Sequence, residues 1–334
     1  MALRTGKLPP ELLTRLLKHN GAKDRRVVLG PTFGEDAAVV KLGKQLLVLK
    51  TDPVTYASDM IGWYAVNVNA NDIATKGATP AWFQAVILLP KGSDESLAED
   101  IFKQISSAAK ELGIAVTGGH TEVTPGIDHP IVVGDIHGVL GEGKVVRTSG
   151  ARVGDAIVLT KGAGIEGTAV IAREKRRDLL KVYDEEFVDR AAKYIFTPGL
   201  SIVREAKAAL KFGVSAMHDP TEGGVAMGVY ELAEASGKSV ELLKDEVIVR
   251  KETAMICAKY RIDPLGLLGS GALLATFRPS AADKFVTEAH RMGMDASVIG
   301  RMLPRTVESR TVSSKGTTPL SFSERDEVLR VLEP

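Results

Sequence analysis

The sequence predicts an α+β fold made of two αβ domains, and three observations support this class. The chain has 334 residues, a length that favours about two domains, each able to bury its own core. Strand-like and helix-like segments are mixed in both halves, without the strict alternation of a single doubly wound sheet. Serine, glycine and charged residues accumulate at 147–154. We therefore place the domain boundary there, with domains at 1–150 and 151–334.

The first half is expected to contain helices and several strands. Its first helix, at 11–17, follows a proline pair and precedes Gly21, the usual order of start and stop residues. We expect Asp52 with Pro53 to end the strand before them. In chain order, the other expected elements are strands at 27–29, 37–40 and 45–50, a helix around Asp72 that stops at 77–80, a strand at 82–89, a helix at 97–112, and strands at 114–117 and 131–139.

The second half restarts with a strand and a glycine-rich turn, and its tail from about Thr311 is polar. Further strand-like and helix-like segments follow in the same mixed order. In chain order, the expected segments are a strand at 155–160, a turn at 161–167, a helix from about Thr168, charged helical residues at 174–194, a glycine-rich point at 218–224, a helix at 225–236, and a second αβ layer at 247–256 and 273–277.

Composition and charge favour a small-molecule partner. Lys and Arg number 43 and Asp and Glu 42, so no overall field attracts nucleic acid or an anionic membrane. The single cysteine, Cys257, excludes an intramolecular disulfide and a cysteine-rich zinc site and fits a reducing compartment. The sequence shows neither a signal-peptide core nor an apolar run of about 18 residues. We therefore expect a cytoplasmic protein without a membrane partner.

The helix expected around Asp72 combines apolar spacing with unusual polar residues. Small and apolar side chains recur at helical intervals, as in a helix packed on a sheet. Three asparagines and Asp72 lie among them, although these residues prefer caps and turns. Because a mid-helix aspartate has no cap to make, we expect its carboxylate to hold a ligand. A solvated helix face is the alternative.

Two more aspartates precede that helix in places suited to metal binding. Asp36 lies in a Gly-Glu-Asp segment just before a strand of small residues, and Asp52 follows an apolar strand. Mg²⁺ takes oxygen ligands, usually one or two carboxylates together with phosphate. We therefore predict that Asp36, Asp52 and Asp72 converge on Mg²⁺ and a nucleotide phosphate. The alternatives are an Asx turn at Asp36 and a turn or helix cap at Asp52.

Residues 162–167 match the G-x-G-x-x-G fingerprint between a strand and a helix. Glycine amides at a helix N-terminus form an anion site suited to phosphate, so Gly162, Gly164 and Gly167 are candidate nucleotide contacts. A dinucleotide fold needs a second parallel strand about 20 residues later, where this sequence is charged and helical. A tight strand-to-helix turn without a ligand is the structural alternative.

A diglycine, Gly118-Gly119, is expected to form a turn at a strand end, where backbone can approach a ligand closely. His120 beside it is a candidate metal ligand or acid–base group, or a hydrogen-bonded structural residue. Asp219 and Glu222 are expected to cap the next helix or to face a substrate. Cys257 lies in an apolar segment and is interpreted as a core thiol.

Taken in order, these segments resemble the aminoimidazole ribonucleotide (AIR) synthetase superfamily, also called PurM-like, and within it the HypE-like hydrogenase expression/formation proteins. The likeness covers nearly the whole chain. The segments that carry it are Gly34-Glu35-Asp36-Ala37-Ala38, Thr51-Asp52, Asn71-Asp72-Ile73-Ala74, Gly77-Ala78-Thr79-Pro80, Gly118-Gly119-His120-Thr121, Gly154-Asp155 with the glycines of 162–167, and Asp219-Pro220-Thr221-Glu222-Gly223-Gly224.

The resemblance implies two PurM-like domains, the first of which forms a homodimer by pairing its sheet with that of its partner. ATP is expected in a cleft between the domains, with Mg²⁺ on its phosphates. The shared chemistry phosphorylates an oxygen, often that of an amide, and so makes it a leaving group. The implied residues are Asp36, Asp52 and Asp72 for Mg²⁺, Asn71, Gly118, Gly119, Thr121, Gly162, Gly164 and Gly167 for nucleotide, and His120, Asp219 and Glu222 as candidate catalytic groups.

Three features depart from this resemblance. HypE proteins end in a tail with a cysteine whose thiol carries a carbamoyl group, whereas this sequence ends in Leu332-Glu333-Pro334. The glycine-rich segment that closes over ATP near the family's N-terminus is missing before Pro9. His120 stands where relatives carry Asp or Glu. Glu122, two residues on, faces the same way if the strand continues, which makes it a further candidate ligand.

The sequence leaves three functions open. The first is an ATP- and Mg²⁺-dependent enzyme that acts on an unidentified small molecule or on a carbonyl or amide group. The second is a nucleotide-binding scaffold without catalysis in a maturation complex. ATP turnover separates these two. The third, an NAD-binding dehydrogenase, rests on residues 162–167 alone.

Overall fold

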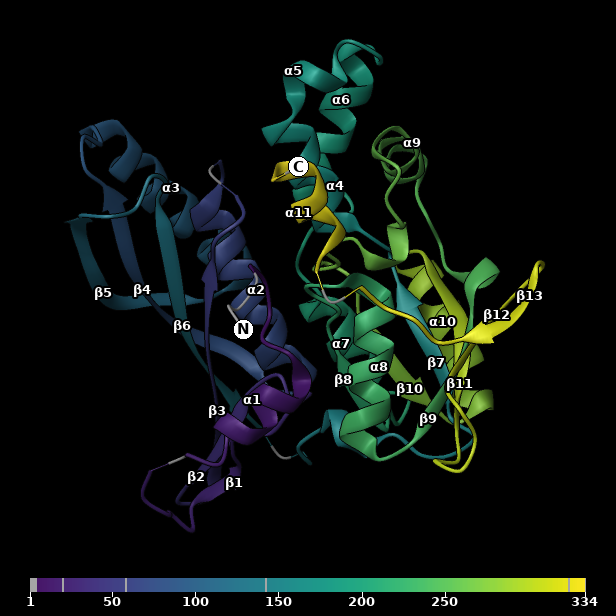
Figure 1. Cartoon of the computed structure of the whole chain (residues 1–334). Coiled ribbons are helices and arrows are strands. Elements are labelled where there is room, and N and C mark those ends of the chain that lie inside the picture. Colours follow the sequence, from purple (N-terminus) through teal and green to yellow (C-terminus); the bar gives the residue numbers. More distant parts are fainter. Residues whose placement is uncertain (1–4, 20, 58, 142, 324, 334) are drawn as a thin grey trace. The chain divides into compact units, whose positions relative to one another are not determined.

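The computed structural model describes residues 5–19, 21–57, 59–141, 143–323 and 325–333. The chain forms two compact units (Figure 1). The segments before residue 37 belong alternately to one unit and to the other.

The smaller unit comprises Asp24–Gly30 and Ala37–Val145, and the larger unit comprises Met1–Lys23, Pro31–Asp36 and Val146–Pro334. The predicted division at residue 150 stays a prediction, and its outer ends, residues 1 and 334, lie outside the described residues. The α+β class itself is confirmed, because each unit holds its own mixed sheet with helices.

The smaller unit holds a sheet with strand order β1-β2-β3-β6-β4-β5. Neighbouring strands are antiparallel, except that β4 and β5 run parallel. Each strand and helix predicted for this stretch is present. The elements are β1 (Val27–Leu29), β2 (Ala38–Leu42), β3 (Gln45–Val54), α2 (Ile61–Thr75), β4 (Thr79–Pro90), α3 (Glu95–Leu112), β5 (Ala115–Thr124) and β6 (Ile131–Leu140).

Helix α2 is buried along its whole length because it lies between the sheet and α3. On the sheet side, glycines of β6 allow the close approach: a Cβ at Gly138 would lie 2.2 Å from Cγ2 of Ile73, and one at Gly134 would lie 2.4 Å from Nδ2 of Asn69. On the other side, the apolar stripe of α3 covers α2. The alternative of a solvated face for α2 is therefore wrong.

Two strands run further than the sequence predicted. β3 continues through Asp52 and Pro53 to Val54, so these residues do not end it. β3 pairs with β6 from Leu46 to Val54, whereas β2 accompanies it no further than Leu49. A proline is tolerated there because its missing N–H can face the unpaired side.

β5 likewise continues through Gly118-Gly119 to Thr124, so the diglycine is not a turn. The register with β4 shifts at this point, where Phe83 pairs with Val116 but Gln84 pairs with Gly118. Thr117 is thus the extra residue of a β-bulge. Gly119 has φ +147°, and a Cβ there would lie 2.2 Å from the carbonyl oxygen of Ala85. Glycine meets the need of a bulge.

The larger unit holds a sheet with strand order β13-β12-β9-β11-β7-β10-β8. Val225, Val229 and Leu232 of α8 pack with sheet residues such as Leu159 and Leu274 in its core. Its elements are α1 (Pro10–Leu16), η1 (Thr148–Gly150), β7 (Ala156–Thr160), α4 (Ile165–Glu174), α5 (Arg176–Leu179), α6 (Glu185–Ala192), η2 (Lys193–Ile195), α7 (Val203–Leu210), β8 (Ala216–His218), α8 (Gly224–Ser236), β9 (Ser239–Leu243), η3 (Lys244–Glu246), α9 (Lys251–Tyr260), η4 (Pro264–Gly266), β10 (Leu274–Phe277), α10 (Pro279–Arg291), β11 (Ala296–Leu303), β12 (Arg310–Ser313), β13 (Gly316–Pro319) and α11 (Glu327–Leu332).

The dinucleotide interpretation of residues 162–167 is wrong on topology. β7, which precedes the loop, pairs antiparallel with β10 on one side and with β11 on the other. A dinucleotide-binding unit needs a parallel strand reached through the helix after the loop. The NAD alternative therefore has no structural basis in this sheet.

Candidate functional site

The asparagines of α2 bond mainly to their own helix. Nδ2 of Asn67 donates to the carbonyl oxygen of Trp63 at 2.9 Å, and Nδ2 of Asn69 donates to that of Ala65 at 2.8 Å. Nδ2 of Asn69 also lies 3.2 Å from the carbonyl oxygen of Asp52 on β3. These bonds give the buried N–H₂ groups acceptors, and the bond to Asp52 ties the helix to β3.

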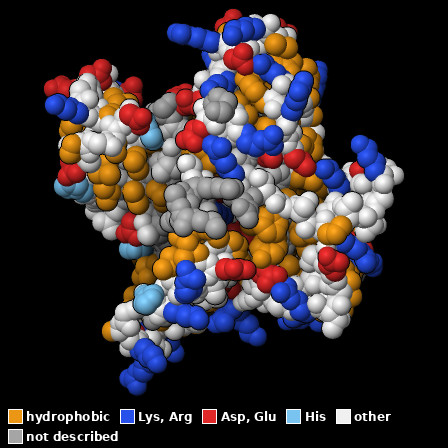
Figure 2. Space-filling view, in the orientation of Figure 1, with side chains coloured by type: hydrophobic (Ala, Val, Ile, Leu, Met, Phe, Trp, Pro, Cys, Tyr) orange, Lys and Arg blue, Asp and Glu red, His pale blue; other side chains and the backbone are white. Residues whose placement is uncertain are grey.

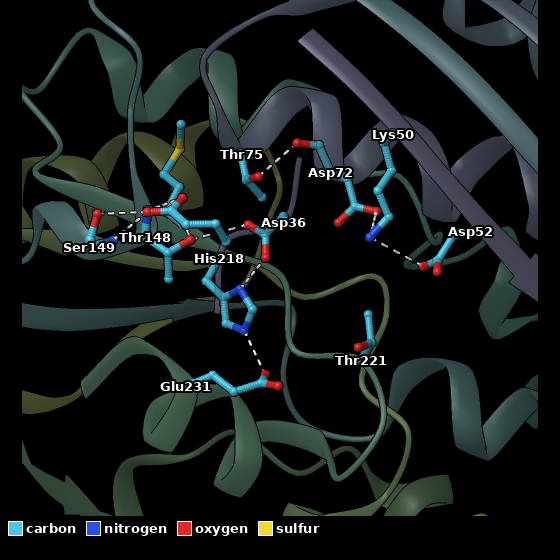
Figure 3. Close-up of polar contacts among 12 residues, drawn as sticks. Asp36, Lys50, Asp52, Asp72, Thr75, Thr148, Ser149, His218, Thr221 and Glu231 are labelled. Carbon is cyan, nitrogen blue, oxygen red and sulfur yellow. Dashed lines mark hydrogen bonds and ion pairs between the residues drawn. The ribbon is translucent and has the colours of Figure 1, made fainter. Parts of the chain in front are cut away.

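Asp52 and Asp72 converge on the ammonium group of Lys50 (Figure 3). Nζ of Lys50 lies 3.1 Å from Oδ2 of Asp72 and 3.7 Å from Oδ2 of Asp52. Lys50 and Asp52 are two residues apart on β3, so both side chains point to the same face of the sheet. The side chain of Asp72 is 5% exposed and that of Asp52 36%. The smaller unit therefore places one positive charge between two carboxylates.

This donor set fits the magnesium ion that the sequence predicted. Carboxylate oxygens are the ligands that Mg²⁺ prefers, and one or two of them per ion are usual. Within the smaller unit the structure brings together Asp52 and Asp72. Asp36 belongs to the larger unit, and the prediction that it shares the same ion stays a prediction.

In the larger unit, Asp36 heads a chain of alternating charges (Figure 3). Nδ1 of His218 lies 2.5 Å from Oδ1 of Asp36, and Nε2 lies 2.9 Å from Oε2 of Glu231. Oε1 of Glu231 in turn accepts from Nζ of Lys7 at 3.3 Å. Asp36, His218 and Glu231 are all buried. A buried chain of this kind is stable only if its charges are paired and hydrogen-bonded.

The two carboxylates keep His218 protonated. Burial disfavours the charged ring, but Asp36 and Glu231 outweigh it and raise the pKa of His218 to about 10. Burial also opposes ionisation of Glu231, yet Lys7 and His218 hold the pKa of that carboxyl below its ordinary value. His218 is therefore an imidazolium at neutral pH, donating from both nitrogens.

Asp219 lies beside this chain. One ligand atom each from Asp36, His218 and Asp219 lie within 4.8 Å of one another. The capping role predicted for Asp219 and Glu222 is wrong: α8 follows Gly223, and no side chain of the described residues caps it. Oε2 of Glu222 instead accepts from the backbone N–H of Lys7 at 2.9 Å. Asp36 forms an ion pair with His218, and the Asx-turn alternative for it stays open.

His120 and Glu122 lie on β5, an exposed edge strand. Nε2 of His120 is 3.1 Å from Oε2 of Glu122. The two side chains therefore face the same way, as predicted for a strand that continues. Gly118, Gly119 and Thr121 belong to the same exposed strand. Their proposed contacts with nucleotide stay predictions.

The glycines of 162–167 pack against a neighbouring chain segment. A Cβ at Gly162 would lie 2.6 Å from the carbonyl oxygen of Ile248, and one at Gly167 would lie 2.5 Å from Cγ of Leu267. The backbone N–H of Ala163 donates to Ile248 and that of Gly167 donates to Leu268, both at 2.9 Å. These contacts give the motif a structural role. Its binding of phosphate stays a prediction.

Both halves of the chain match one family. Residues 34–140 match the N-terminal domain of AIR synthase related proteins, and residues 152–313 match the C-terminal domain. The chain belongs to the AIR synthase related family. The resemblance inferred from the sequence is confirmed.

Several curated relatives are named carbamoyl dehydratase HypE or hydrogenase expression/formation protein. The carbamoyl dehydratase HypE of Rhizobium leguminosarum bv. viciae is 27% identical over 280 residues, covering 81% of this chain and 77% of the relative. A Methanocaldococcus jannaschii protein named for hydrogenase expression and formation is 26% identical over 275 residues, covering 80% and 78%.

Solved structures show the same fold. A hydrogenase maturation protein HypE in complex with ATP superposes with a TM-score of 0.74 at 23% identity, covering 97% of this chain and 98% of the other. AaThiL complexed with AMPPCP and TMP has a TM-score of 0.71 at 22% identity, covering 93% and 94%.

Sequence reasoning missed the partners of the predicted acids in this AIR synthase related chain. Lys50 is an ordinary residue of an apolar strand, and Glu231 an ordinary residue of a helix. His218 was the one with a usable signal, because it directly precedes Asp219 at a glycine-rich point. Its contact with Asp36 spans 182 residues of sequence, which no local pattern reports.

Two acids of the larger unit also escaped notice. Burial, despite a hydrogen bond to Ser270, raises the pKa of Glu166 to about 8. Burial likewise raises the pKa of Asp326 to about 7. Negative charge on Asp326, Glu222 and Asp219 adds to the shift at Glu166. A neutral carboxylic acid therefore lies near the loop that carries Asp219.

Cys257 is a core thiol, as the sequence predicted. Its side chain is buried in α9. Burial raises the pKa of the thiol to about 12, so the nucleophilic thiolate is scarce at neutral pH.

Among the described residues, no helix is both long and apolar enough to span a membrane.

Proposed function

We propose that this chain is an ATP- and Mg²⁺-dependent enzyme that phosphorylates the oxygen of an amide or related carbonyl group and then eliminates phosphate. Membership of the AIR synthase related family and relatives named carbamoyl dehydratases support this chemistry. The observation that carries the proposal is the convergence of Asp52 and Asp72 on one cation position.

Asp52 and Asp72 would hold Mg²⁺, with Asp36 as a further predicted ligand. A bound Mg²⁺ neutralises phosphate charge, which is the main electrostatic requirement of phosphoryl transfer. The ammonium of Lys50 lies between the two carboxylates. When Mg²⁺ binds these carboxylates, Lys50 would pair with a phosphate oxygen instead. The remaining proposed contacts are Asn71, Gly118, Gly119, Thr121, Gly162, Gly164 and Gly167 for nucleotide, Glu122 as a further metal ligand, and His120, Asp219 and Glu222 as catalytic groups.

The reaction proposed for an amide substrate balances without another reactant. The amide oxygen attacks the γ-phosphorus of ATP, and ADP leaves. The new C–O–P linkage makes oxygen a leaving group as phosphate. Loss of phosphate and of both amide protons converts R–C(=O)NH₂ into R–C≡N, so the products are nitrile, ADP and inorganic phosphate. The phosphoryl-transfer step requires mainly positioning and charge stabilisation.

We propose that the amide or carbonyl group that accepts the phosphoryl group belongs to another molecule and is not attached to Cys257. The thiol of that residue is buried and protonated at neutral pH. A carbamoyl group attached there would have no access to nucleotide bound elsewhere. The substrate class is therefore a carboxamide or related carbonyl compound supplied to the enzyme.

We also propose a cytoplasmic homodimer joined through the β5 edge. β5 has a neighbour on one side in the described sheet, and its side chains Val116 and Val123 are 51% and 57% exposed. Figure 2 shows hydrophobic side chains at this side of the smaller unit. An exposed edge strand with apolar side chains is a template for pairing with a second copy.

Thermal unfolding with ATP, Mg²⁺, MgATP and NAD tests the nucleotide site. A ligand at about 100 times its dissociation constant adds roughly 2.7 kcal/mol. We expect MgATP to raise the midpoint well beyond ATP or Mg²⁺ alone, and Asp72→Asn to remove the difference. Asp100→Asn, at an exposed helical aspartate of the same unit, is the matched control. Equal shifts for Asp72→Asn and the parent would refute the site.

Turnover separates the enzyme from the scaffold alternative. ADP and phosphate release is measured with MgATP alone and with carbamoyl phosphate and simple carboxamides added. Stabilisation by MgATP without turnover under any condition would favour the non-catalytic nucleotide-binding scaffold.

A further inference from the structure

The loop at residues 218–224 connects β8 to α8 and carries Asp219, Thr221 and Glu222. We call it the aspartate loop. Its first residue, His218, forms the buried contacts with Asp36 and Glu231 described above. Asp219 lies beside Asp36 and His218. Any function of Asp219 therefore depends on how this loop is held.

The N-terminal segment holds the aspartate loop through Lys7. The backbone N–H of Lys7 donates to Oε2 of Glu222 at 2.9 Å, and its Nζ donates to Oγ1 of Thr221 at 3.0 Å. The same ammonium reaches Oε1 of Glu231 at 3.3 Å, which in turn holds His218. Lys7 thus contacts two residues in the middle of the aspartate loop and also Glu231, the residue that holds His218.

The C-terminal segment holds the loop through Asp326. Oδ2 of Asp326 accepts from the backbone N–H of Gly223 at 2.6 Å. Oδ1 accepts from Val328 at 2.7 Å and from Leu268 at 3.2 Å. The bond to Val328 is the ordinary N-cap of α11. The bonds to Gly223 and Leu268 are not needed for the cap. They join the C-terminal segment to the aspartate loop and to the segment that contains Leu268.

The two segments meet at the loop. A methyl group at Gly6 would lie 3.8 Å from Cδ1 of Leu329 in α11 and 3.9 Å from Oε2 of Glu222. Leu329 and Asp326 are 1% and 4% exposed. The tail is therefore packed into the larger unit, with its cap carboxylate turned toward the loop.

We propose that Lys7 and Asp326 form a two-sided clamp that positions the aspartate loop for catalysis. The inference rests on the proposed function for its catalytic consequence. Lys7 and Asp326 lie outside the residues matched by the two family domains, 34–140 and 152–313. Both are positioning residues, because they act through Asp219 and Thr221.

Substitutions at Asp326 and Lys7 remove separate contacts of the clamp. Asp326→Asn keeps one carbonyl oxygen for the α11 cap but presents an N–H₂ group where the second oxygen accepted from Gly223. Lys7→Met keeps an unbranched apolar stem and removes the ammonium that contacts Thr221 and Glu231. Lys7→Arg restores a cation. Glu333→Gln, which removes a surface charge paired with Arg325, and Arg15→Met, on the exposed face of α1, are the controls.

The first readout is hydrogen exchange of the backbone amides of Asp219 and of residues 221–224, measured on the full chain without nucleotide. We expect about tenfold faster exchange in Asp326→Asn and Lys7→Met, with unchanged protection of β7 and with parent-like behaviour in Lys7→Arg and both controls. Unchanged exchange in the loop, or equal acceleration throughout the larger unit, would overturn the clamp.

The second readout is the split between kcat and KM for ATP turnover. A positioning role predicts at least a tenfold lower kcat in both variants and a KM for ATP within about threefold of the parent, with rescue by Lys7→Arg. Faster exchange of the loop with unchanged kcat would reject the positioning role. If the parent shows no turnover, the proposed function fails, while the exchange experiment still decides whether the clamp holds the loop.

Discussion

Lys50 shows at the scale of one residue how the smaller unit prepares a cation position. Two carboxylates close to each other repel, and the ammonium between them offsets that repulsion. In the presence of Mg²⁺ the same position can hold the metal instead. The lysine is thus a test of whether Asp52 and Asp72 form a metal site.

Lys50→Met should lower stability without divalent ions and increase the response to Mg²⁺. The substitution removes the ion pair between Lys50 and the buried carboxylate of Asp72, at a cost of about 1–3 kcal/mol. Mg²⁺ alone should then raise the unfolding midpoint of the variant more than that of the parent, because no ammonium competes for the position. Thermal unfolding at increasing MgCl₂ measures both effects.

Lys41→Met on the adjacent strand β2, where the side chain is exposed, is the matched control and should respond to Mg²⁺ as the parent does. Loss of stability without any added response to Mg²⁺ would show that the pair of carboxylates is structural.

His218 makes stability depend on pH in a definite direction. Its pKa is raised in the folded protein from the ordinary 6.5 to about 10. The folded state therefore gains stability from the protonated ring fully below about 6.5 and loses it as pH rises through about 10. Between these values the loss is up to about 1.4 kcal/mol per pH unit. Denaturant unfolding from pH 6 to 10 measures this slope.

His218→Gln should be less stable near pH 6 and show a flatter decline between pH 7 and 10. Glu166, whose pKa is raised to about 8, also lowers stability as pH rises from about 4.5 to about 8, so Glu166→Gln is measured in parallel to separate the two. Parallel slopes for the parent and His218→Gln would contradict an imidazolium at this position.

The acids at these sites could be predicted from the sequence and their partners could not. Asp72 lies mid-helix without a cap to make, and Asp36 lies in a Gly-Glu-Asp segment just before a strand, so their positions are unusual in themselves. Lys50 and His218 become significant only through contacts. Those contacts join β3 to α2 and join residues 182 apart in sequence.

At the scale of elements, the close packing of α2 on β6 sets the position of Asp72. Gly138 lies beneath Ile73, the neighbour of Asp72. The helix can keep its distance from the sheet only while position 138 has no side chain.

Gly138→Ala should destabilise the smaller unit by about 1–3 kcal/mol, the usual cost of overpacking a close-packed contact. Its Cβ would lie 2.2 Å from Ile73 and 2.8 Å from the carbonyl oxygen of Thr79. Denaturant unfolding measures the loss, and MgATP affinity should fall with it because α2 must move. Gly141→Ala, where no atom lies within 4 Å of the added Cβ, is the control. Equal stability of the two variants would refute the close approach.

The local sequence pattern predicted the strands and helices of the smaller unit, but it did not predict where β3 and β5 end. Pro53 and Gly118-Gly119 are turn signals in isolation, and each lies inside a strand here. An unpaired edge accommodates the proline, and a bulge accommodates the glycines. The same limit applies to residues 162–167, where glycines typical of a phosphate loop also satisfy packing against Ile248 and Leu267.

At the scale of the whole molecule, the chain does not divide at one point. Residues before Asp24 and at 31–36 belong to the larger unit, although residues between and after them belong to the smaller one. A sequence boundary drawn from composition assumes contiguous domains, so it could not place these segments. These early segments place Asp36 and Lys7 in the unit that contains His218 and Glu231, and the four residues are joined by hydrogen bonds.

The edge strand β5 yields the prediction for assembly. Its ten residues present unpaired backbone groups on one side in the described sheet. Val123 is 57% exposed there, and such an edge is stable in solution when a second copy covers it. Light scattering during size-exclusion chromatography should give the mass of a dimer for the parent and of a monomer for Val123→Lys, because a charge on the edge opposes pairing. Val153→Lys, at a similarly exposed valine of the larger unit, should remain dimeric. A monomeric parent, or a dimer that survives Val123→Lys unchanged, would place the interface elsewhere.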